Sequence, residues 1–130
     1  MLFYATVGAH DIAQSAIFYD AALSTLGWER LREVNDEIGY GPKGDRPRIW
    51  LLKPFNGLPA SFGNGILICL YARSRAEVDK FYAAAIASGG QDEGKPGLRS
   101  VDSGYLPNWY ACYVRDPTGN KLSAVYDQPI

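Results

Sequence analysis

The sequence predicts an α+β fold in which one βαβββ module is used twice. Two observations support this prediction. Residues 18–23, reading FYDAAL, return as residues 81–86, reading FYAAAI, and glycine follows at Gly27 and at 89–90. Each stretch follows one apolar, strand-like run and precedes several others. Two copies of such a module can face each other across a groove, and a groove is where we expect a ligand.

The first copy opens with an apolar run over residues 2–8 that we expect to be a strand. Asp11 is expected to cap a helix, because its carboxylate can accept hydrogen bonds from the free N–H groups of the first turn. Apolar residues then recur at spacings of three and four until Gly27, a typical helix stop. Three strands are expected next, over residues 28–34, 37–41 and 48–52.

The second copy repeats this order after a segment rich in Pro, Gly and Asn. We expect one domain over residues 1–130, with module one at 1–53, a linker at 54–64 and module two at 65–130. In module two, Ser74 and Glu77 match a capping box at the start of a helix. The remaining expected elements are strands at 66–71, 109–115 and 121–126, a loop with a short strand inside it at 91–107, and a tight turn at 116–120.

The composition excludes several classes of function. The net charge is −1 and no basic run is present, so we expect no binding to nucleic acid. The apolar runs are too short for a membrane helix, and the N-terminus lacks the positive region of a signal peptide. The two cysteines are too few for a disulfide scaffold. These features predict a cytoplasmic protein that does not bind membranes.

Three stretches make the chain resemble a known superfamily. The most specific is residues 115–122 (RDPTGNKL), where an Asp-Pro-x-Gly-Asn turn precedes the last expected strand, and residues 11–28 and 74–81 add to it. Together they resemble the vicinal oxygen chelate superfamily, which includes glyoxalase I, bleomycin-resistance proteins, fosfomycin-resistance proteins and extradiol dioxygenases. The resemblance covers nearly the whole chain. It implies that the two βαβββ modules form a curved mixed sheet around a cup.

The resemblance also implies a divalent metal ion between the modules. In the superfamily it is held by a His on the first strand of each module and a Glu on the last strand, and it acts on substrates as a Lewis acid. Aligned on the helix caps and the final turn, these positions carry Tyr4, Leu67 and Ser123. A neutral phenol, an alkyl chain and a neutral hydroxyl are poor metal ligands. We therefore expect neither a metal site of this kind nor another cofactor.

The positions expected to face the cup provide the candidate ligand-binding residues. They are Tyr4, Thr6, Trp50, Leu67, Cys69, Tyr110, Cys112 and Ser123. The aromatic residues Trp50, Trp109 and Tyr110 fit two interpretations equally well: a wall for a flat, apolar or cationic ligand, or plain core. The thiols of the two cysteines are expected to be buried and inert, and the alternative is that both face the cup, since alternation places Cys69 on the same face as Leu67.

Three polar residues have a surface interpretation and a functional one. His10, the only histidine, is expected in an exposed loop beside the helix cap, and the alternative is a general base at the rim of the cup. Glu37 and Arg48 are expected to be solvated, and the alternative places them at the mouth of the cup.

The leading functional hypothesis is a glyoxalase/bleomycin-resistance-like protein that lacks the usual metal ligands and binds a small molecule in the cup. The alternative is an active lyase, isomerase or dioxygenase of glyoxalase type. It would use displaced metal ligands, or work without metal with Tyr4 as the acid. A purely structural or interaction module is a third hypothesis. A homodimer, common among similar proteins, would cover exposed sheet edges.

Overall fold

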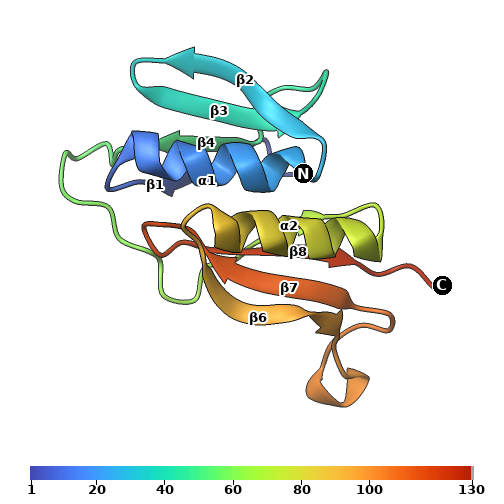
Figure 1. Cartoon of the computed structure of the whole chain (residues 1–130). Coiled ribbons are helices and arrows are strands. Elements are labelled where there is room, and N and C mark those ends of the chain that lie inside the picture. Colours follow the sequence, from blue (N-terminus) through green and yellow to red (C-terminus); the bar gives the residue numbers. More distant parts are fainter. Residues whose placement is uncertain (130) are drawn as a thin grey trace.

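The computed structural model describes residues 1–129, which form two α-helices, one short 3-10 helix and two four-stranded sheets (Figure 1). Sheet one has the order β1-β4-β3-β2 and contains β1 (Ala5–Gly8), β2 (Trp28–Val34), β3 (Glu37–Pro42) and β4 (Ile49–Leu52). Sheet two has the order β5-β8-β7-β6 and contains β5 (Ile68–Tyr71), β6 (Gln91–Leu98), β7 (Tyr110–Arg115) and β8 (Lys121–Tyr126). The helices are α1 (Ile12–Ser24), α2 (Arg75–Ala87) and the 3-10 helix η1 (Val101–Ser103).

The two sheets repeat one topology. In each, the first strand of the module pairs parallel with the last, β1 with β4 and β5 with β8, and the other strand pairs are antiparallel. A parallel pair needs a crossover, and α1 and α2 lie in those crossovers. The predicted α+β fold with two βαβββ modules is confirmed. None of its helices within residues 1–129 is long and apolar enough to cross a membrane.

Both helices begin at the predicted caps. The Asp11 carboxylate accepts a hydrogen bond from the Gln14 N–H at 3.0 Å, and the Ser74 hydroxyl accepts one from the Glu77 N–H at 3.1 Å. The Glu77 carboxylate reaches one residue further back than a capping box requires and accepts from the Arg73 N–H at 3.1 Å. Each cap satisfies N–H groups that have no partner inside the helix.

The core lies between each sheet and its helix, and it continues between the two helices. Figure 1 shows α1 and α2 side by side in the middle of the molecule, with β2 and β3 of sheet one above α1 and β6 and β7 of sheet two below α2. Phe18, Tyr19 and Phe81 on these helices are fully buried. Gly90 follows α2, and a Cβ there would lie 2.7 Å from the Phe18 ring of α1, so the close approach of the two modules requires glycine.

The largest difference from the sequence prediction is β6. We expected a loop with a short strand inside residues 91–107, and the structure has an eight-residue strand that pairs with β7. The register of this pair shifts twice, between Asp92 and Gly94 and between Gly94 and Gly97. The two glycines and one proline of β6 interrupt the alternation of apolar and polar residues by which a strand is predicted from sequence. A strand at the edge of a sheet and with bulges tolerates both residue types, which is why this segment can still pair with β7.

Candidate functional site

Each sheet has one face covered by its helix and one face turned away from it, which we call the open face. On sheet one the open face carries a hollow of about 420 Å³. Three of the expected ligand-binding residues, Tyr4, Thr6 and Trp50, lie together in its wall. The other lining residues are Phe3, Arg32, Val34, Glu37, Pro47 and Leu52.

Three of the lining residues, Thr6, Arg32 and Trp50, belong to one row of paired residues that crosses all four strands. Arg32 pairs with Gly39, Gly39 with Trp50, and Trp50 with Thr6. A Cβ at Gly39 would lie 2.9 Å from Pro47 and 3.0 Å from the far edge of the Trp50 ring. The bare backbone at Gly39 therefore gives the indole the space in which it lies. Trp50 is half-buried, which leaves part of the ring accessible to a ligand.

The open face of sheet two has a corresponding row. Gly94 pairs with Tyr113, Tyr113 with Ser123, and Ser123 with Cys69, which brings two of the expected residues together. The Ser123 hydroxyl is fully buried and has no hydrogen-bond partner of normal length among residues 1–129. The Cys69 thiol is exposed; partial burial raises its pKa, and the neighbouring Ser123 hydroxyl offsets this in part.

Aromatic residues surround this second row. Trp109 donates from its indole Nε1 to the Tyr113 hydroxyl at 3.2 Å, and its ring lies 6.5 Å from that of Tyr105. The cations of Arg99 and Lys121 lie over the Tyr113 ring, at 5.4 and 5.6 Å from its centre. Leu67, just before β5, is 41% exposed. A small hollow of about 130 Å³, lined by Thr6, Lys121 and neighbouring residues, lies where β1 comes near the starts of β5 and β8.

Two expected ligand-binding residues lie on the opposite face of β7. The Cys112 thiol is buried against α2 and donates to the Val78 carbonyl at 3.8 Å, and burial raises its pKa to about 11. The Tyr110 hydroxyl donates to Asp79 of α2 at 2.7 Å, and Arg75 lies 5.0 Å from the centre of its ring. The expectation that Tyr110 and Cys112 line the cup is therefore corrected, because both pack against the helix.

The residues at the superfamily's metal positions do not fit a divalent ion. Tyr4 and Leu67 are 49% and 41% exposed, and Ser123 is buried. None of the three offers a carboxylate, imidazole or thiolate ligand. No group of three or more His, Cys, Asp or Glu side chains within residues 1–129 has the arrangement of a metal site. We therefore derive no chemical step through a metal ion.

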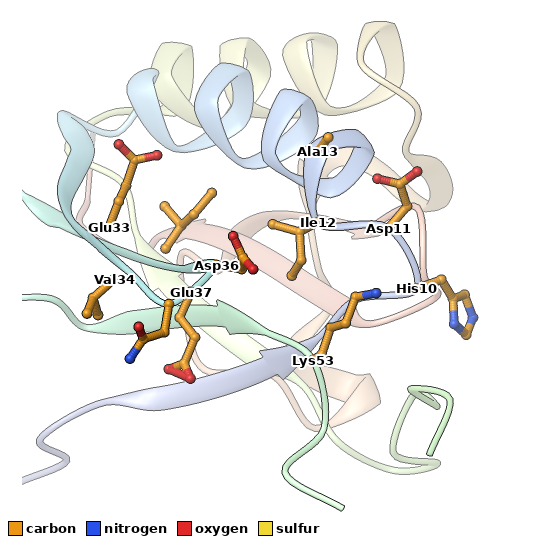
Figure 2. A pocket seen from close by; sticks show the side chains of 11 residues that line it. His10, Asp11, Ile12, Ala13, Glu33, Val34, Asp36, Glu37 and Lys53 are labelled. Carbon is orange, nitrogen blue, oxygen red and sulfur yellow. The ribbon is translucent and has the colours of Figure 1, made fainter. Parts of the chain in front are cut away.

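A third hollow, of about 830 Å³, lies between the start of α1 and the turn that joins β2 to β3 (Figure 2). His10 and Lys53 line it together with Asp11, Asp36 and Glu37. His10 is exposed, as expected for a loop histidine, and lies at the rim in Figure 2. Its backbone N–H donates to the Thr118 hydroxyl at 3.1 Å, so its backbone fixes the end of β1 against the turn of module two.

That turn, the most specific motif of the sequence, has a structural role. One oxygen of the Asp116 carboxylate accepts from the N–H groups of Thr118, Gly119 and Asn120, each at 2.9 Å. The other accepts from the buried Tyr19 hydroxyl of α1 at 2.6 Å and from the Asn120 amide at 2.8 Å. The same amide donates to the Gly8 carbonyl at 2.8 Å, so the turn ties module two to both β1 and α1.

Sequence reasoning missed five residues that line the hollow on sheet one, and for a sixth, Glu37, it favoured the surface role over the one at the mouth of the cup. The five are Phe3, Arg32, Val34, Pro47 and Leu52. Nothing in the sequence marks Arg32 as a site residue, because a charged residue in an exposed strand is ordinarily solvated. Glu37 was expected at the surface, and it lines the hollow on sheet one. Arg48, by contrast, pairs with Asp45 at 3.0 Å and donates to the Phe3 carbonyl, which orients the chain before β1.

Comparisons with known proteins place this geometry in a family. No protein-family model and no curated protein matches the chain. Solved structures do match. A glyoxalase/bleomycin resistance protein from Albidiferax ferrireducens is 35% identical, covering 97% of each chain with a TM-score of 0.79.

Two further structures are similar in fold. A glyoxalase-related enzyme from Fulvimarina pelagi is 21% identical over 94% of this chain and 85% of its own, with a TM-score of 0.70. A lactoylglutathione lyase from Agrobacterium tumefaciens is 22% identical over 95% of this chain and 91% of its own, with a TM-score of 0.61. These two likenesses show the fold alone. With the repeated βαβββ modules and the Asp-Pro-x-Gly-Asn turn, the 35% identity to the Albidiferax ferrireducens protein leads to one conclusion: the chain belongs to the glyoxalase/bleomycin resistance protein family.

Proposed function

We propose that this protein binds a small molecule on the open faces of its sheets without a metal ion of the superfamily type. One observation carries the proposal. The three positions expected to hold the metal carry Tyr4, Leu67 and Ser123, while the surrounding fold and an aromatic hollow of about 420 Å³ remain. A hollow of this size is within the range of small-molecule sites, roughly 300–1,000 Å³.

The ligand contacts we propose come from both sheets. On sheet one they are Tyr4, Thr6 and Trp50, which offer aromatic surface and two hydroxyls. On sheet two, Ser123 supports a polar contact, because a buried hydroxyl without a partner costs free energy until a ligand or water satisfies it. Leu67 and Cys69 would add apolar contact beside it. Tyr110 and Cys112 would not contact this ligand, since their side chains face α2.

The open faces also support a proposal of homodimerisation. Ile66, two residues before β5, and Tyr71, the last residue of β5, are 64% and 81% exposed, and β1 and β5 are both edge strands. Exposed apolar side chains beside an unpaired strand edge favour association with a second copy. We expect light scattering after gel filtration to give a dimer, and Tyr71→Lys to give more monomer. A wild-type chain that stays monomeric at high micromolar concentration would contradict this proposal.

The proposed function is tested by ligand screening combined with metal analysis. The protein is purified without chelators, dialysed against Ni²⁺, Zn²⁺, Fe²⁺ and Mn²⁺, and analysed for bound metal. A metabolite library is then screened by thermal shift on the wild type and on Trp50→Leu. We expect no stoichiometric metal, and stabilising compounds whose effect disappears in Trp50→Leu.

The control and the enzymatic alternative use two further variants. Phe55→Leu changes a fully exposed aromatic residue outside the hollow and should respond to ligands like the wild type. Stoichiometric metal would contradict the proposal and favour an enzyme with displaced ligands. Turnover of a stabilising compound that is lost in Tyr4→Phe would favour the metal-independent enzyme.

A further inference from the structure

We propose that the hollow on sheet one selects a flat, zwitterionic ligand, an aromatic compound that carries both a carboxylate and an ammonium group, such as an aromatic amino acid. This inference rests on the proposed function, because it names the ligand class of the same site. It depends on three features of the hollow: a bulge in β2, two opposite charges without partners, and the accessible indole of Trp50.

The bulge decides where Arg32 points. Residues two apart on a regular strand share a face, but the register of β2 against β3 shifts between Arg30 and Arg32. Arg30 pairs with Tyr40 and reaches Asp20 of α1 at 2.7 Å, so it lies on the covered face. Arg32 pairs with Gly39 and lines the hollow on the open face. The extra residue at the bulge therefore turns the Arg32 side chain into the site, a common use of bulges beside binding sites.

The charge of Arg32 has no internal partner. Arg30 contacts two carboxylates and Arg48 contacts one, whereas Arg32 forms no ion pair within residues 1–129. Its guanidinium is thus free for a ligand carboxylate, which it can bind through two parallel hydrogen bonds. This arrangement favours a planar anionic group on the ligand.

Glu37 provides the opposite charge in the same hollow. It pairs with Val34 across the β2–β3 ladder, diagonally to Arg32, and it also has no ion-pair partner within residues 1–129. Figure 2 shows its carboxylate on the side of the sheet away from α1. The diagonal positions are about 7–8 Å apart. The opposite charges of Arg32 and Glu37 leave the hollow without net charge. A ligand with a single charge would pair with one of these two residues and leave the other without a partner.

Trp50 lies next to these charges and determines the shape of the ligand. The indole lies against the bare backbone of Gly39, between the strand of Glu37 and the edge strand of Thr6. A half-buried indole offers a flat apolar surface for stacking. A ligand ring on this surface would place its charged groups over β2 and β3, where Arg32 and Glu37 lie.

The experiment compares three probes that share a phenyl ring. They are L-phenylalanine, 3-phenylpropionate, which lacks the ammonium group, and phenethylamine, which lacks the carboxylate. Binding is followed by the tryptophan fluorescence of the full chain and by ligand-observed NMR. We expect L-phenylalanine to bind about tenfold more tightly than either singly charged probe, equivalent to about 1.4 kcal/mol for the second charged contact.

Two variants separate the charges. Arg32→Met should weaken L-phenylalanine and 3-phenylpropionate about tenfold and leave phenethylamine unchanged. Glu37→Gln should weaken L-phenylalanine and phenethylamine and leave 3-phenylpropionate unchanged. Lys80→Met, on the exposed face of α2, is the matched control and should change none of the three affinities.

Failure of this inference differs from failure of the proposed function. If 3-phenylpropionate binds as tightly as L-phenylalanine and Glu37→Gln has no effect, the ligand is an anion and the inference is overturned. If no charged probe binds but the neutral dye N-phenyl-1-naphthylamine binds and is lost in Trp50→Leu, the inference fails and the proposed function stands. If the neutral dye also fails to bind, both are overturned.

Discussion

Replacement of Asp116 by alanine is the most direct test of how the two modules are held together. The carboxylate accepts five hydrogen bonds, three from backbone N–H groups and two from the side chains of Tyr19 and Asn120. Asp116 is 3% exposed and Tyr19 is 0% exposed. After the substitution, the Tyr19 hydroxyl and the buried Thr118 N–H lose their acceptor, and water has little access to replace it.

The expected cost follows from these two donors. Each buried donor without a partner costs about 1–3 kcal/mol, so we expect the two donors orphaned in Asp116→Ala to lower the free energy of unfolding by about 2–6 kcal/mol. Tyr19→Phe removes only one donor, and the carboxylate keeps four others, so about 1–2 kcal/mol is expected. The losses in free energy of unfolding should not add in the double variant. In the Tyr19→Phe chain there is no Tyr19 hydroxyl left to lose its acceptor when the Asp116 carboxylate is removed.

Urea unfolding followed by circular dichroism measures these free energies. With a slope of about 2 kcal/mol per M, a loss of about 4 kcal/mol moves the midpoint by about 2 M. Asp102→Ala, in the exposed helix η1, is the control and should stay within about 0.5 kcal/mol of the wild type. A loss below about 1 kcal/mol in Asp116→Ala, or full additivity with Tyr19→Phe, would refute the reasoning.

Three further predictions concern the hollow, the thiols and alkaline pH. Gly39→Ala should lower the free energy of unfolding by about 1–3 kcal/mol and weaken the binding of probes that stack on Trp50, because the new Cβ would clash with that ring and with Pro47. An unchanged urea midpoint and an unchanged probe affinity would contradict this. A thiol reagent at neutral pH should modify only Cys69 in the wild type and no thiol in Cys69→Ser, because Cys112 is buried and its pKa is raised to about 11. Rapid reaction of both thiols in the folded protein would be inconsistent with that burial. Burial and the Asp116 carboxylate raise the pKa of Tyr19 well above its ordinary value, so deprotonation is easier in the unfolded chain and stability should fall as pH rises above about 10; this fall should be smaller in Tyr19→Phe, as measured by urea midpoints at increasing pH.

The sequence by itself predicted the elements whose signals are local. The N-caps at Asp11 and Ser74 depend on a side chain that bonds to its own helix, and the structure has both bonds. The strand over 28–34 and the strand over 121–126 were predicted with their observed bounds. The repeat of FY-containing helices predicted the doubled module, because each helix carries the same buried stripe. The family resemblance followed from the same local motifs.

The sequence can predict which residues of a strand lie on the open face only where one side of that strand is polar and the other apolar. On β7 the run Tyr110-Ala111-Cys112-Tyr113-Val114 is apolar on both faces, so alternation cannot tell which residues face the helix. Packing against α2 decides this, and it places Cys112 in the core and Tyr113 on the open face. For the same reason two of the eight expected ligand-binding residues lie on the other side of the sheet.

The tertiary structure alone decided three further features. The β6 strand exists because β7 supplies its hydrogen-bond partners, whereas its own residues read as a loop. Arg32 enters the hollow because a bulge shifts the register of β2, and a bulge leaves no mark in the pattern of apolar residues. The turn at Asp116 was readable as a turn, but its bonds to Tyr19 and Gly8 join segments about a hundred residues apart in sequence. Local sequence therefore determined which elements form, and long-range contacts determined which side chains those elements bring together.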